Sequence, residues 1–218
     1  MPDPGHFEIN LSGQYTRVLG GTTATVPGFE INYGVIERLQ ISVAAQLALS
    51  HVDGVGANAG PGDVRIALKY RFIDAAKDGW RPDVAFAPAI TIPSGSQQRG
   101  LGAGQIQGFL PLWVAKEFGP WTVFGGGGYT INPGPGRLNW WFAGLGVKRE
   151  IDANWSFGAE IFQTTATQRG GKDSTGFNLA ALYNFNETHH IMAAVGRNLL
   201  HARENNEFSA LLNYQITF

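Results

Sequence analysis

Apolar and polar residues alternate one by one along most of the chain, which is the pattern of β-strands with two unlike faces. In the last twelve residues every second position is apolar, from Phe208 to Phe218, and most residues between them are polar. Residues 64–72 are a second clear example, because Ile66, Leu68 and Tyr70 lie on one face and the basic residues Lys69 and Arg71 on the other. The alternation predicts twelve strands, at residues 6–17, 25–37, 40–51, 63–72, 83–93, 105–117, 121–131, 139–150, 155–165, 175–185, 189–198 and 207–218.

The connections between these strands alternate in length. Short turns are expected near 37–38, 119–120, 151–154 and 186–188, with 73–82 as a longer member of that set. The intervening Gly/Asn/Ser-rich loops are longer, at 18–24, 52–62, 94–104, 132–138, 166–174 and 199–206. Short periplasmic turns and long external loops are typical of up-and-down outer-membrane barrels. We therefore expect an all-β fold without helices: residues 1–218 form one antiparallel transmembrane β-barrel of about twelve strands, with both termini periplasmic.

Aromatic residues on the apolar face gather at the two ends of the expected strands, and aliphatic residues and glycines lie between them. Two aromatic girdles around an aliphatic band suit a bilayer with two polar interfaces. The girdle expected at the short-turn end includes Tyr70, Phe72, Trp121, Trp155, Tyr183, Phe185 and Tyr214.

Composition supports a membrane setting. Charged residues make up 15% of the chain, against about 25% in soluble domains. No run of about 18 apolar residues is present, so a transmembrane helix is not expected. A net charge of −1 gives no basic footprint for nucleic acid, and the absence of cysteine excludes disulfides and thiolate chemistry.

One alternative is a soluble β-sandwich or lipocalin-like barrel, because alternation alone does not say which face is outside.

Two prolines, Pro88 and Pro111, fall within expected strands. A closed barrel has no free edge for a residue without an N–H, so the strand registers around both are uncertain and β-bulges are expected there.

The polar faces of these strands should line the barrel interior. Twelve tilted strands give a backbone diameter of about 24 Å and a free width on the order of 10 Å. One wall is expected to be charged and the opposite wall aromatic, so a ring-shaped acid or phenol could stack on the rings while its oxygen meets Arg65 or Lys69. The alternative is that inward charges only pair with one another and that the rings fill space. The expected lining residues are Glu8, Glu30, Arg65, Lys69, Arg71, Phe109, Trp113, Phe124, Trp140, Phe142, Lys148, Glu160 and Phe162.

Catalytic and metal-binding motifs are not apparent. A lipase-like barrel needs a serine, a histidine and an orienting polar group together, and neither G-x-S-x-G nor H-E-x-x-H occurs. Asp53, Asn58 and Asp63 on one loop could bind Ca²⁺ loosely, but a turn-forming, solvated loop is the favoured explanation of these residues. We expect no enzyme activity, no cofactor and no metal.

Several short motifs follow one another in order along the chain. They are GPGDVRIALKYRF at 60–72, TIPSG at 91–95, GLGAG at 100–104, KEFGPWTVF at 116–124 and GY at 128–129. Their order and spacing resemble those of the phenol meta-pathway degradation family of outer-membrane barrels, in which a G-x-G-D strand is followed by K-Y/W-R-F. The resemblance implies an outer-membrane barrel that aids uptake of aromatic compounds. Phe218 also resembles the C-terminal aromatic signal read by the outer-membrane assembly machinery.

The leading hypothesis is therefore an outer-membrane pore that passes small solutes, aromatic ones among them, by passive or weakly selective diffusion. Its expected partners are the lipid bilayer, the assembly machinery and a small-molecule solute, and its oligomeric state stays open. The alternative is a structural or interaction barrel whose lumen is plugged by side chains and whose external loops bind a protein partner.

Overall fold

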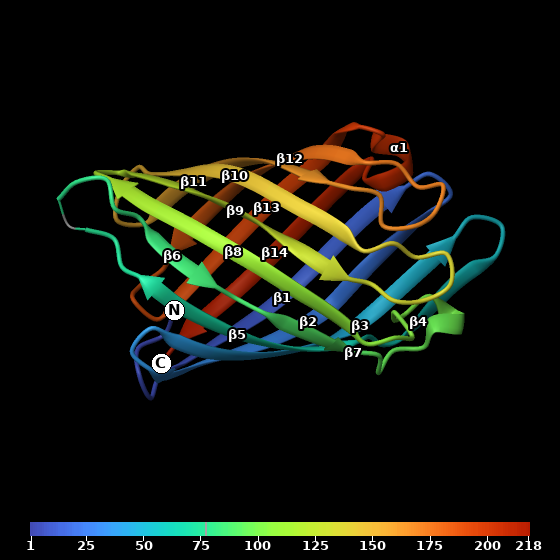
Figure 1. Cartoon of the computed structure of the whole chain (residues 1–218), viewed down its shortest axis with the longest axis horizontal. Coiled ribbons are helices and arrows are strands. Elements are labelled where there is room, and N and C mark those ends of the chain that lie inside the picture. The colour runs from blue at the N-terminus through green and yellow to red at the C-terminus, as the bar shows by residue number, and fades with distance from the viewer. Residues whose placement is uncertain (77) are drawn as a thin grey trace.

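Fourteen strand segments pair in one antiparallel sheet, and this sheet closes on itself because β1 also pairs with β14 (Figure 1). The computed structural model describes residues 1–76 and 78–218. Segments β4 and β5 form one crossing and β6 with β7 another, so the closed barrel has twelve strands, as predicted. The segments are β1 (Phe7–Val18), β2 (Gly21–Ile36), β3 (Leu39–Val52), β4 (Gly56–Pro61), β5 (Val64–Ile73), β6 (Asp83–Phe86), β7 (Ala89–Ile92), β8 (Gln107–Phe118), β9 (Trp121–Ile131), β10 (Trp140–Glu150), β11 (Trp155–Thr164), β12 (Ser174–Asn184), β13 (His189–Leu200) and β14 (Phe208–Thr217).

Two of the predicted external loops are largely strand, so that part of the prediction is wrong. The loop expected at 18–24 is a tight turn, because β1 ends at Val18 and β2 begins at Gly21. The loop expected at 52–62 contains β4, which pairs with the end of β3. Extended pairing with a neighbouring strand gives backbone groups their hydrogen bonds despite a composition rich in Gly, Thr and Asn.

The prediction of no helix is also wrong in detail. A 3-10 turn, η1, covers Gln97–Arg99, and a one-turn helix, α1, covers Ala202–Asn205. Both lie in the longer loops, and α1 lies at the end of the barrel opposite both termini (Figure 1). No helix in the described ranges is long and apolar enough to cross a membrane.

The two prolines lie next to each other in the wall. Pro88 falls between β6 and β7, where pairing is interrupted, and its carbonyl accepts the N–H of Leu68 at 3.0 Å. Pro111 remains inside β8, fully buried and paired with Gly128 of β9. On its other side Pro111 faces the interruption, where the N–H of Ala87 donates to its carbonyl at 3.2 Å. The break is therefore located at Pro88, and the missing donor of Pro111 faces no regular strand partner.

The two faces of the wall differ as the alternation predicts. On β8 the apolar residues Leu110, Leu112 and Val114 are exposed, whereas Trp113 between them is partly covered inside the barrel. On β10 Trp141 is 60% exposed and Trp140 beside it is half-buried. Large apolar side chains thus cover the outside, and the residues of opposite parity turn toward the axis.

Candidate functional site

One side of the barrel interior is lined by aromatic rings from β8, β10 and β11. The centroid of the Phe109 ring lies 6.4 Å from that of Trp140, and the two rings are stacked. The ring centroid of Trp113 lies 6.1 Å from that of Phe142, and the centroid of Phe142 lies 6.2 Å from that of Phe162. The predicted aromatic residues of these three strands thus pack as one pair and one group of three on the same side of the interior, and together they are called the aromatic wall.

Glycines on neighbouring strands make room for these rings. A Cβ built on Gly128 would be 2.5 Å from the Phe109 ring, and one built on Gly126 would be 2.8 Å from the Trp113 ring. Phe124 lies in the same way against Gly146, and Phe162 against Gly176. Because each ring occupies the space of a missing side chain, it lies along the wall and leaves the centre of the barrel less obstructed.

The opposite wall, on β1 to β3 and β14, carries a hydrogen-bonded polar network. The Glu8 carboxylate accepts from the side-chain amides of Asn10 at 3.0 Å and Asn32 at 2.8 Å. Asn32 also accepts from Gln40 at 2.8 Å, and Asn32 and Gln40 are buried. Glu8 is thus satisfied by amides of its own wall and takes part in no ion pair of the described residues.

Basic residues at the short-turn end lie beside the aromatic wall. Lys69 and Arg71 line a cavity of about 310 Å³ together with Asp83, Trp113 and Phe124. A solute in this cavity would therefore meet positively charged side chains and two aromatic rings.

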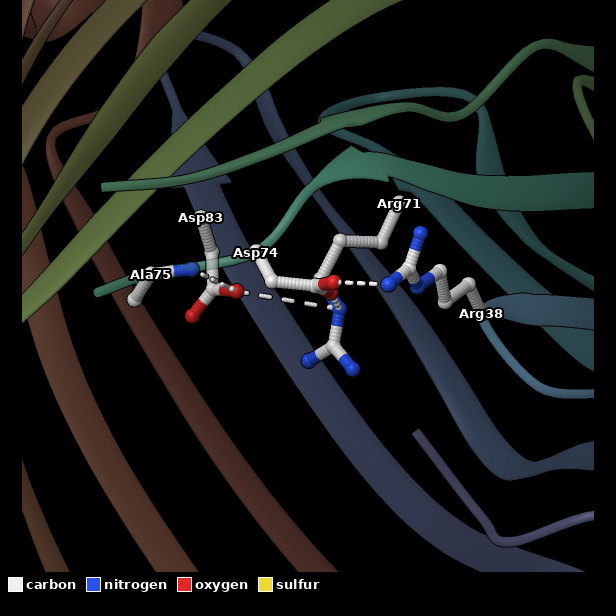
Figure 2. A network of polar contacts seen from close by, with 5 residues as sticks. All are labelled: Arg38, Arg71, Asp74, Ala75 and Asp83. Atoms are coloured by element: carbon white, nitrogen blue, oxygen red, sulfur yellow. Dashed lines mark hydrogen bonds and ion pairs between the residues drawn. The ribbon is translucent and has the colours of Figure 1, made fainter. Parts of the chain in front are cut away.

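Arg71 is held by a network of ion pairs at the adjoining turn (Figure 2). Its Nε lies 3.0 Å from Oδ1 of Asp74 and 3.7 Å from Oδ1 of Asp83, and Asp74 also pairs with Arg38. Asp83 in turn accepts the backbone N–H of Ala75 at 3.0 Å. Much of the charge of Arg71 is neutralised there, whereas Lys69 takes part in no ion pair of the described residues.

The remaining predicted lining residues are more dispersed. The guanidinium of Arg65 lies over the Phe109 ring, 5.9 Å from its centroid. Lys148 pairs with Glu150 at 3.0 Å, and Glu160 accepts from Asn178 at 2.6 Å. Glu30 lies half-buried on β2, away from the aromatic wall.

A larger cavity of about 490 Å³ occupies the side of the interior formed by β9 to β14 and β1. Phe124, Lys148, Glu160 and Phe162 contribute to its lining, as do small residues such as Ala180. Phe124 also lines the smaller cavity, so this ring lies where the two spaces adjoin. The aromatic residues of this lining lie at positions of inward parity, whereas the small side chains beside them carry little sequence signal.

The loop between β7 and β8 folds back into the mouth of the barrel. Leu101 in this loop is 4% exposed and packs against Gly60, whose strand partner is Ala48. Ala48 is buried and the residues on both sides of it are exposed, so this contact is on the inner wall.

Asp63 fastens this loop. Its two carboxylate oxygens accept the backbone N–H groups of Gly95 at 2.9 Å and Ala103 at 2.6 Å. Arg99 donates to the carbonyl of Ala59 at 2.8 Å, and Arg137 donates to that of Ala103 at 2.5 Å. The sequence did not predict that this loop packs inward, since the path of a loop leaves no periodic signal. Asp63, considered above as a calcium ligand, instead has both oxygens engaged by the chain.

The predicted girdle residues lie on the outer face at the short-turn end. Trp155 packs on Tyr183 with centroids 4.8 Å apart, and Tyr183 packs edge-on against Phe185 at 5.0 Å. The Tyr214 hydroxyl lies 2.7 Å from Nδ1 of His189. Tyr70, Phe72 and Trp121 are likewise exposed on this face, and Phe218 follows β14 with its N–H donated to the carbonyl of Phe7.

The histidines are not arranged as a catalytic triad requires. His6 contacts the carbonyl of Phe218, His190 the side chain of Asn184, and His201 the carbonyl of Asp173. His51 lies 3.4 Å from Asp53. In the described part of the chain no histidine bonds to a serine, and no group of three His, Asp or Glu residues is placed to hold a metal ion.

Comparison with solved structures identifies the same class of fold, a porin-like β-barrel. The KdgM porin, solved with disordered oligogalacturonate, matches with a TM-score of 0.64 at 7% identity, over 98% of this chain and 99% of that one. The NanC porin matches with a TM-score of 0.62 at 10% identity, over 96% and 98%. CymD, described as a monoaromatic hydrocarbon channel, matches with a TM-score of 0.55 at 10% identity, over 100% and 89%. Neither a protein-family model nor a curated protein sequence matches the chain.

Proposed function

We propose that this barrel is an outer-membrane channel through which small solutes, aromatic ones among them, diffuse passively or with weak selectivity. The observation that carries the proposal is the interior, where aromatic rings border two cavities. Trp113 lines the cavity of about 310 Å³ and Phe162 the cavity of about 490 Å³, and both rings pack against Phe142. Cavities of this size suit small-molecule ligands. An interior plugged by side chains, the alternative function, gives no reason for the rings to pack against glycines of the wall.

The apolar outer face supports the membrane setting. A water-soluble protein rarely exposes a continuous apolar surface of this kind, whereas a bilayer favours it. We infer that this face meets lipid, that the short turns and both termini are periplasmic, and that β14 with Phe218 is the segment recognised during assembly. The neighbours named above are porins and a channel, and their likeness supports the fold on which these proposals rest.

The proposed solute path passes the aromatic wall and the basic groups beside it. A planar ring can stack on Trp113 or Phe124, and an anionic oxygen can approach Lys69 in the same cavity. This arrangement favours an aromatic acid over a neutral or non-aromatic solute of equal size. It also agrees with the resemblance to barrels linked to aromatic uptake.

Single-channel recording in planar bilayers tests the proposal. Folded wild-type protein should give steady currents, and benzoate should reduce them at lower concentration than cyclohexanecarboxylate, which has the same charge without the aromatic face. Trp113→Leu should remove this difference, whereas Trp155→Leu on the outer face should retain it. Silence from verified folded protein would support the plugged scaffold instead.

A further inference from the structure

Two arginine side chains point outward on either side of Phe208. Arg17 of β1 is the direct strand partner of Phe208 in β14. On the other side of β14, Gly196 of β13 pairs with Ser209, so Arg197 is the next residue opposite Phe208. Adjacent strands are about 4.8 Å apart, so the Cα atoms of the two arginines are separated by roughly 10 Å across β14.

Alternation fixes both side chains on the outer face. Val195 and Leu199, two residues before and after Arg197, are 50% and 58% exposed, whereas Asn198 between them is buried inside the barrel at 2%. Arg17 shares the outward parity of Tyr15, and its own side chain is 63% exposed. Two guanidinium groups are thus placed among the apolar side chains of the outer face.

Charge on a surface that meets lipid requires a compensating partner. An arginine on the lipid face of a barrel costs about 2–4 kcal/mol at the bilayer midplane and about 0–1 kcal/mol near the interfaces. Both arginines lie near the ends of their strands, at the barrel end that carries α1 and the longer loops.

The protein itself compensates these charges incompletely. Arg17 contacts Glu207 at 3.5 Å in an exposed ion pair, which contributes little. Arg197 takes part in none of the ion pairs formed by residues 1–76 and 78–218. A guanidinium binds phosphate oxygens in a bidentate geometry, and lipid headgroups supply phosphates at the interfacial depth.

We propose that Arg17 and Arg197 bind the phosphate-bearing headgroup of a lipid in the outer leaflet, with its acyl chains against Phe208, Val195 and the aliphatic band below. This inference rests on the proposed membrane setting and orientation, but it is independent of whether the lumen conducts. The site is distinct from the solute path, because it lies on the outer face of β1, β13 and β14.

Native mass spectrometry of the whole chain in detergent tests the inference, with lipid A carrying two phosphates as the probe. Two charge-assisted contacts are removed in the Arg17→Gln/Arg197→Gln double variant, so its dissociation constant should rise by about tenfold or more. The matched control is Arg169→Gln, which removes one arginine from an external loop at the same end of the barrel and should bind as the wild type does. The backbone N–H of Arg169 donates to the carbonyl of Gly136, which lies in the neighbouring long loop, so Arg169 lies outside the strands.

Two further arms identify the ligand chemistry. Lipid A stripped of both phosphates should bind wild type as weakly as it binds the double variant, and pyrophosphate alone should not compete, because it lacks the acyl chains. Equal binding of intact lipid A by the wild type and the double variant would overturn the inference, as would an equal loss in Arg169→Gln. A barrel that binds lipid A in this pattern yet passes no current would overturn the channel proposal and leave the lipid site in place.

Discussion

Phe109 lies on Gly128 of the adjacent strand, so closely that a Cβ on this glycine would be 2.5 Å from Cε2 of the ring. Ring and glycine together explain how aromatic side chains and the two interior cavities fit into the same barrel. The same relationship recurs where Phe124 meets Gly146 and where Phe162 meets Gly176.

Replacing this glycine should therefore narrow the path. Gly128→Ala places a methyl group where the Phe109 ring lies, so the ring must turn toward the axis, and overpacking of this kind costs about 1–3 kcal/mol. We expect a lower single-channel conductance and a lower free energy of unfolding in urea. Gly108→Ala on the same strand as Phe109 is the matched control, since its added Cβ shares the outward parity of Leu110 and would lie 3.7 Å from the nearest atom, in the side chain of Ile131. Equal conductance of the two variants would contradict the proposed role of Gly128.

Release of the inward loop should widen the mouth. Asp63→Asn retains the shape of the side chain but replaces one accepting oxygen with a donor, and hydrogen bonds to charged groups contribute about 1.5–3 kcal/mol each. We expect higher conductance and faster trypsin cleavage after Arg99, which the wild type holds against Ala59.

Asp53→Asn tests whether this effect belongs to Asp63. Asp53 lies in the neighbouring hairpin turn and contacts His51 instead of the inward loop. The Asp53→Asn variant should therefore have the same conductance and the same trypsin cleavage rate as the wild type. Protection of Arg99 in Asp63→Asn would show that the loop is held without Asp63.

Ion selectivity should depend on Lys69. At about 4 Å in water, one unit charge attracts an anion by about 1 kcal/mol, so its loss lowers the local anion concentration about fivefold. We expect Lys69→Gln to shift the reversal potential in a KCl gradient toward cation preference. Lys172→Gln, which removes a loop charge paired with Glu204, should shift it much less. An unchanged potential in Lys69→Gln would remove this residue from the ion path.

Sequence alternation predicted most of this fold, because a barrel wall repeats the same two-faced requirement on every strand. The inward positions of Phe109, Trp113 and Phe162 follow directly from that periodicity. The lengths of the β1–β2 and β3–β4 hairpins could not be predicted from this alternation, because Gly- and Thr-rich segments pair as strands only when a neighbouring strand is present. The packing of Leu101 inside the mouth depends on contacts between residues about forty positions apart, which no local pattern records.

Acid should weaken the turn between β10 and β11. The backbone N–H groups of Trp155 and Asn154 donate to the Asp152 carboxylate and lower its pKa below the ordinary value of 3.8. A lowered folded-state pKa means that the stabilisation is present above the unfolded-state pKa and is lost as the pH falls through the folded-state value. The unfolding free energies of the wild type and Asp152→Ala should therefore differ at neutral pH and converge in strong acid. A difference that persists there would exclude the carboxylate as its source.

The central claim is that the apolar face of each strand meets lipid while the opposite face meets a water-filled lumen. The chain contains no cysteine, so single nitroxide labels can be attached at Leu179→Cys, 51% exposed outside, and at Ala180→Cys, which lines the larger cavity. In proteoliposomes, the label at 179 should be relaxed mainly by oxygen dissolved in the lipid, and the label at 180 mainly by a water-soluble nickel complex. The reverse pattern, or equal access of the nickel complex to both labels, would contradict the account.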